Sequence, residues 1–156
     1  MPVLNLLHLL AALTIAACLY ALWREARGAS QSRGHLMVPP PLAFGCALLM
    51  IGLTEPDRQQ PDTLRIAIAA GVLLGTARGW FMAVDIDPLW STVRLPSGSD
   101  GFWLAILLAF AVIMAAAAPL VSTQGQSYVP YAATAVAFGA GFLSARAVTV
   151  YLRTRS

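Results

Sequence analysis

Residues 63–84 read TLRIAIAAGVLLGTARGWFMAV, an apolar run long enough to cross a bilayer as a helix. The hydrocarbon core of a bilayer is about 30 Å thick, and a helix needs about 20 apolar residues to cross it. Four more runs of this kind, separated by short links, lie at about 2–23, 36–54, 102–121 and 128–152. The sequence therefore predicts an all-α fold, a polytopic membrane helix bundle of about five transmembrane helices, in a single integral membrane domain over residues 1–156.

The composition of the whole chain agrees with a membrane protein. Of its 156 residues, 58% are hydrophobic and 11% are charged, whereas a soluble domain carries about 25% charged residues. The net charge of +3 comes from scattered arginines, and a nucleic-acid-binding protein needs basic residues clustered on one face. The absence of Lys and the abundance of Ala, Leu and Gly are typical of a GC-rich bacterial genome. We therefore expect a bacterial inner-membrane protein and exclude a nucleic-acid partner.

Arginine is distributed unevenly between the two sides of the predicted spans. One side carries Arg58 and Arg65, and the other carries Arg24, Arg27, Arg33, Arg94, Arg153 and Arg155. Cytoplasmic links carry an excess of basic residues. We therefore expect the N-terminus outside and the C-terminus in the cytoplasm. Four tryptophans fall near the predicted cytoplasmic ends of the spans and favour the same orientation, namely Trp23, Trp80, Trp90 and Trp103.

The run 36–54 is unusual because Pro39, Pro40 and Pro41 fall near its start. Proline is tolerated only in the first turn of a helix. A helix that begins there keeps about 15 residues and spans about 22 Å, which is less than the hydrocarbon thickness. Two alternatives stay open: a short span entered through a sheltered polyproline stretch, or a re-entrant element.

A small residue recurs at every fourth position of the run 63–84, at Ala67, Gly71, Gly75 and Gly79. Residues four apart lie on one face of a helix, and small side chains there let another helix approach closely. The pattern predicts that Gly71, Gly75 and Gly79 pack against a neighbouring helix of the same bundle.

Two arginines, Arg78 and Arg146, stand inside apolar runs. A charge in the bilayer is costly unless it is paired, faces a cavity or reaches the interface. Each arginine lies seven residues before a predicted cytoplasmic boundary, so both sit about 10 Å inside it. We expect them to form a cytoplasm-facing pocket that binds an anion such as a lipid headgroup, with Asp85 nearby. The alternatives are that Glu25 or Asp87 neutralises them, or that both extend to the headgroups.

No pattern in the sequence indicates catalysis, a metal site or a cofactor. The chain has no H-E-x-x-H, no G-x-S-x-G and no phosphate-binding glycine loop. His8 and His35 fall at opposite ends of the predicted spans, and Cys18 and Cys46 do not form a C-x-x-C pair. We therefore expect no catalytic residue, no metal and no cofactor, although a membrane enzyme stays an open alternative.

The middle of the chain has an order of features that is shared with a known group of proteins. Residues 75–79 read GTARG, an acidic turn and an extended stretch follow at 85–94, and PSGS at 96–99 leads into the run 102–121. This order resembles the small multipass bacterial proteins of the CcdC-like type, over about residues 71–121. The resemblance implies an accessory part in cytochrome c maturation, and the chain lacks the cysteine pair that a thiol-transfer protein needs.

These observations favour a non-enzymatic membrane protein that acts as an accessory or assembly factor through helix packing and partner interaction. The alternative is a small transporter or a lipid- or anion-binding protein that uses the arginine pocket. The expected partners are the lipid bilayer, another membrane protein or a second copy of the chain, and an anionic lipid.

Overall fold

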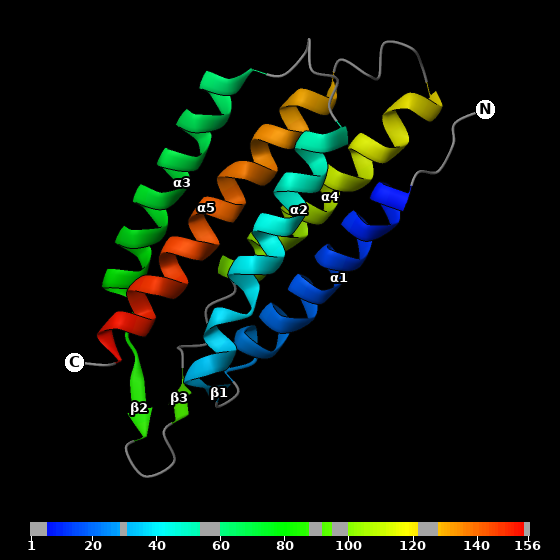
Figure 1. Cartoon of the computed structure of the whole chain (residues 1–156). Helices are drawn as coiled ribbons and strands as arrows, with labels where there is room; N and C mark the ends of the chain where they lie inside the picture. Colours follow the sequence, from blue (N-terminus) through cyan, green and yellow to red (C-terminus); the bar gives the residue numbers. More distant parts are fainter. Residues whose placement is uncertain are drawn as a thin grey trace.

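The computed structural model describes residues 6–28, 31–53, 60–87, 92–94, 100–121 and 128–154. In this part of the chain five α-helices run lengthwise beside one another (Figure 1). They are α1 (Leu6–Ala26), α2 (Pro39–Leu53), α3 (Pro61–Phe81), α4 (Asp100–Val121) and α5 (Val129–Arg153). The prediction of an all-α fold with five helices is confirmed.

Among the described residues, three helices are long and apolar enough to cross a membrane, namely Gly34–Gly52, Pro61–Phe81 and Val129–Arg153. The first of these joins a short 3-10 helix, η1 (Arg33–Met37), to α2. The two remaining helices, α1 and α4, contain shorter apolar stretches at Leu9–Trp23 and Asp100–Ala115. Helix length and composition therefore make this a multipass membrane protein.

The helix α2 begins at Pro39 and has 15 residues. The three prolines occupy its first turn, where the backbone N–H groups that proline lacks would have no partner inside the helix. Although α2 is short, η1 and α2 together extend along the bundle from the sheet end toward the opposite end (Figure 1). This path favours the short span over the re-entrant alternative.

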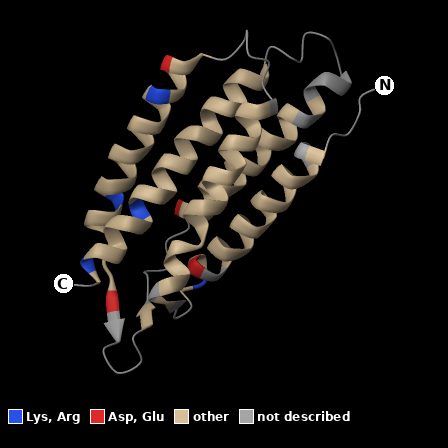
Figure 2. Ribbon diagram, in the orientation of Figure 1, with Lys and Arg blue, Asp and Glu red and all other residues tan. Residues whose placement is uncertain are grey.

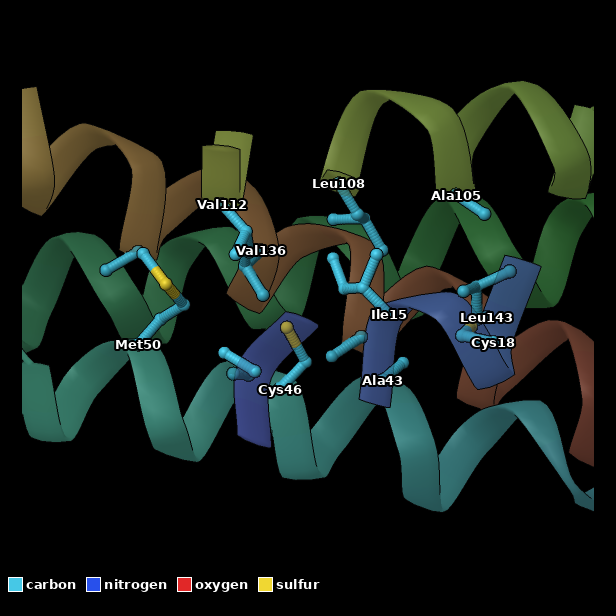
Figure 3. Close-up of a cluster of buried hydrophobic side chains, with 14 of the residues drawn as sticks. Ile15, Cys18, Ala43, Cys46, Met50, Ala105, Leu108, Val112, Val136 and Leu143 are labelled. Atoms are coloured by element: carbon cyan, nitrogen blue, oxygen red, sulfur yellow. The ribbon is translucent and has the colours of Figure 1, made fainter. Parts of the chain in front are cut away.

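The helices α1, α2, α4 and α5 surround a common apolar core. Side chains from all four helices point into this core (Figure 3), among them Cys18 of α1, Cys46 and Met50 of α2, Leu108 of α4 and Val136 of α5. Many of the buried side chains are alanines, so the helices approach closely. The fifth helix, α3, lies outside this group at the edge of the bundle and packs along α5 (Figure 1).

A small antiparallel sheet closes one end of the bundle. It contains β1 (Gln31–Ser32), β2 (Asp85–Asp87) and β3 (Thr92–Arg94), in the order β1-β3-β2. In the register of β2 and β3, Asp85 lies opposite Arg94 and Ile86 opposite Val93.

Val93 anchors this sheet to the helices. It is fully buried in a second apolar cluster, together with Leu36, Met82 and Val150. The sequence predicts only turns and an extended stretch here, because three-residue strands are too short to show a clear pattern.

Some predicted features lie outside the described residues. Arg58, Trp90 and Arg155 fall in segments that the structure does not describe, and the side chains of five further residues are also outside it: His8, Arg24, Arg33, Asp87 and Arg94.

Candidate functional site

Charged residues gather at the end of the bundle that carries the sheet (Figure 2). The opposite end of the described chain shows one residue of each sign at the start of α3 (Figure 2), the exposed pair Asp62 and Arg65. Arg78 and Arg146, the predicted anion-binding residues, both lie at this sheet end.

Arg146 is buried among α1, α4 and α5, with only 4% of its surface exposed. Its Nη2 donates to a carboxylate oxygen of Glu25, whose side chain is also mostly buried, and lies 4.0 Å from the Sδ of Met82. Its Nε has no hydrogen-bond partner among the described residues. The guanidinium is therefore held inside the protein by the last turn of α1 and does not extend to the surface.

Arg78 makes a different ion pair, in which its Nε donates to Asp100 in the first turn of α4. The side chains of Arg78 and Asp100 are 42% and 37% exposed. The neighbour expected from the sequence was Asp85, which is exposed on β2. Asp100 replaces it because α4 starts beside the end of α3, a proximity that spacing along the chain does not reveal.

The two arginines approach the same turn of α4 from different sides. A Cβ on Gly101 would collide with Nη1 of Arg146, so this guanidinium touches the residue that follows the Asp100 partner of Arg78. The free space around Arg146 is about 20 Å³ and is bounded by Leu22 and neighbouring side chains. A space of this size holds about one water molecule, so it has no room for a lipid headgroup.

A third arginine, Arg153, stabilises the same end of the bundle. Its Nη1 donates to the backbone oxygens of Gly79 at 2.9 Å and of Met82 at 2.8 Å. The last carbonyl groups of a helix lack partners within the helix, and here Arg153 of α5 supplies one for α3. In the sequence Arg153 indicates only the orientation of the chain, and no pattern there predicts this contact.

The glycine stripe of α3 faces α5. Gly71, Gly75 and Gly79 are the buried residues of α3, and a Cβ on any of them would collide with the backbone of α5. The nearest atoms are the carbonyl oxygens of Phe138, Phe142 and Arg146, the last at 2.9 Å from a Cβ on Gly79. Close contact between these helices therefore depends on the absence of side chains along the stripe.

A groove of about 640 Å³ lies between α3 and α4, with α5 as its floor. The wall on α3 includes Thr63 and Ala67, the wall on α4 includes Leu107, and the floor includes Thr134 and Phe138. No pattern in the sequence indicates this groove, because its walls and floor come from three helices that are distant from one another in the chain.

No family model, characterised protein or solved structure matches this chain. The resemblance to the CcdC-like proteins therefore stays a prediction. The case for a function rests on the contacts of the described residues.

Proposed function

We propose that this chain is a non-enzymatic accessory or assembly factor of the bacterial inner membrane that acts by packing a helix against a partner membrane protein. The observation that carries the proposal is the position of α3, which packs along α5 at the edge of the bundle (Figure 1). Its face opposite the glycine stripe therefore stays open within the membrane. The part in cytochrome c maturation that the CcdC-like resemblance implies is one version of this role.

The open face of α3 has the composition of a helix-packing surface. Ala69, Leu73, Thr76 and Ala77 are all exposed, and their spacing places them on one side of the helix. The hydroxyl of Thr76 already donates to the carbonyl of Val72 at 2.8 Å, so this face carries no unsatisfied polar group there. Interfaces between transmembrane helices are enriched in such small residues because they let backbones approach closely.

The proposed topology has five spans, with the N-terminus outside and the C-terminus in the cytoplasm. The helices α1 and α4 have 21 and 22 residues, or about 32 Å at 1.5 Å per residue, which is close to the hydrocarbon thickness of about 30 Å. Trp23 supports an interface at the sheet end: it packs edge-on against Phe102 with ring centroids 5.1 Å apart, and Arg27 lies over it at 4.6 Å. Aromatic residues and an excess of arginine are typical of a cytoplasmic interface.

Site-specific photocrosslinking tests the proposed partner surface. A photoreactive side chain at Leu73 should give one discrete protein adduct in membranes, whereas the same group at Ile113, which is exposed on α4, should not. Ala69→Phe should then abolish copurification of the captured protein because a large ring prevents close helix packing. Equal adducts from Leu73 and Ile113, or adducts with lipid only, would refute this surface.

The alternative role, an anion- or lipid-headgroup-binding pocket made by Arg78 and Arg146, receives less support. Each arginine is neutralised by a carboxylate of the chain, Asp100 or Glu25, and little free space remains beside Arg146. An external anion would have to displace an internal partner.

A further inference from the structure

We propose that the groove between α3 and α4 binds one acyl chain of a phospholipid in the leaflet next to the start of α3. This is the outer leaflet in the proposed orientation. The site is separate from the proposed partner surface, because Ala67 lines the groove and Ala69 lies on the other side of α3.

Polarity changes along the groove as it does along a lipid. Its polar lining residues lie at the starts of α3 and α5 and include Gln60, Thr63 and Tyr131. The hydroxyl of Thr63 donates to the side-chain oxygen of Gln60 at 3.0 Å, so two of the groups in this polar rim are hydrogen-bonded to each other. Deeper in the bundle the lining is apolar, with Leu104 and Phe138 among its residues.

The length of the groove fits one leaflet. Pro130 and Phe138 both line the floor, and their eight-residue separation corresponds to about 12 Å along a helix. The hydrocarbon depth of one leaflet is about 15 Å, half of the bilayer core. An acyl chain whose ester group lies at the Gln60 rim can therefore extend along the groove to its inner end.

An ion pair joins the two walls on the sheet side of the groove, which excludes a transmembrane helix as its occupant. At the inner end of the groove, α3 meets α5 at the contact of Gly71 with Phe138. Farther toward the sheet, Arg78 on the groove side of α3 pairs with Asp100 of α4 and bridges the two walls. A helix that crosses the whole bilayer would have to break this ion pair, whereas an acyl chain ends before it.

Small side chains make the room for the acyl chain. Ala67 and Ala135 line the groove from α3 and α5, where larger residues would fill it. Inside a bilayer the surrounding medium is hydrocarbon, so the material available to an apolar groove at this depth is lipid. The ion pair on the sheet side and the polar rim together favour one acyl chain in one direction.

Photolabelling from the lipid tests the site in the full-length protein. The protein is reconstituted in vesicles of phosphatidylethanolamine and phosphatidylglycerol that contain phosphatidylethanolamine with a diazirine in the middle of one acyl chain. We expect labelling of segments 60–67 and 130–138 several-fold above that of the exposed face of α4 at Phe110 and Ile113. Ala67→Phe should reduce this labelling several-fold, and Ala135→Phe, which fills the groove from α5, should do the same.

Ala69→Phe is the matched control, because it adds the same ring to the other side of the same helix. It should leave the lipid labelling unchanged while it abolishes partner copurification, and Ala67→Phe should do the reverse, so the two proposals fail separately. Thermal melting in detergent verifies that all variants fold. Even labelling of all exposed faces, unchanged labelling in Ala67→Phe and Ala135→Phe, or protein adducts from the groove would overturn the acyl-chain site.

Discussion

The ion pair of Arg146 with Glu25 is the residue-scale feature on which the sheet end of the bundle depends. Both side chains are mostly buried, and the Nε of the arginine has no described partner. Removing one member of a buried ion pair leaves an uncompensated charge, which costs about 3–5 kcal/mol. We expect Glu25→Gln to lower the free energy of unfolding by about this amount, as measured by thermal or denaturant unfolding in detergent.

The pair of Arg78 with Asp100 provides the control for this prediction, because its side chains are far more exposed. An exposed ion pair contributes about 0–1 kcal/mol, so Arg78→Gln should change the unfolding free energy little. The double variant Glu25→Leu with Arg146→Met should recover the stability that Glu25→Gln loses, because well-packed apolar residues replace a buried pair at little cost. If Glu25→Gln and Arg78→Gln have equal effects, burial does not set the importance of these pairs.

At the scale of single elements, α3 is attached to the bundle chiefly through its glycine stripe. A side chain at Gly75 would collide with the backbone of Phe142, and a helix backbone cannot move aside as a flexible side chain can. Overpacking of this kind costs about 1–3 kcal/mol or more. Gly75→Leu should therefore separate α3 from α5, detected as loss of a disulfide crosslink between cysteines placed on facing positions of the two helices.

Ala69→Leu is the matched control, because Ala69 is exposed on the face of the same helix opposite the glycine stripe. It should leave both the crosslink and the melting temperature unchanged. If Gly75→Leu also retains the crosslink and the native stability, the stripe is not what holds α3 against α5.

Among the sheet side chains that the structure describes, Val93 is the buried one, in a cluster with Leu36, Met82 and Val150. Val93→Ala removes two buried carbons, at about 0.8 kcal/mol each, before any cavity is counted. The variant should lose about 2 kcal/mol of stability and show faster hydrogen exchange in β2 and β3. Thr92→Ala, at the less buried neighbouring position, should have little effect, and equal exchange rates in both variants would show that Val93 does not anchor the sheet.

For the whole molecule, the proposed orientation makes the sheet end cytoplasmic. In the described chain α1 starts at the opposite end and α5 finishes at the sheet end (Figure 1). Alkaline phosphatase, which is active only after export, should therefore be inactive when fused after α5 and active when fused between α2 and α3. The positive-inside rule is the physical basis of this expectation.

A cytoplasmic reporter such as green fluorescent protein should give the opposite pattern at the same two positions. Phosphatase activity from the fusion after α5 would overturn both the orientation and the five-span topology, whatever the reporter between α2 and α3 shows.

The helices themselves could be predicted from the sequence, because the drive to leave water is a local property of each apolar run. The run 128–152 became α5 (Val129–Arg153), and Pro39 set the start of α2 as the missing N–H groups require. The spacing of Gly71, Gly75 and Gly79 likewise predicted a packing face, since helical periodicity alone puts these residues on one side.

Only the tertiary structure decided which helix meets that face and which carboxylate meets each arginine. Periodicity describes the faces of one helix but says nothing of its neighbours, so the contact of Arg78 with Asp100, where Asp85 was expected, depends on how α4 is placed beside α3. The edge position of α3 and the groove beside it have the same origin. Both features arise because the other four helices pack around a common core of small residues, formed by α1, α2, α4 and α5. As a result, α3 packs chiefly along α5.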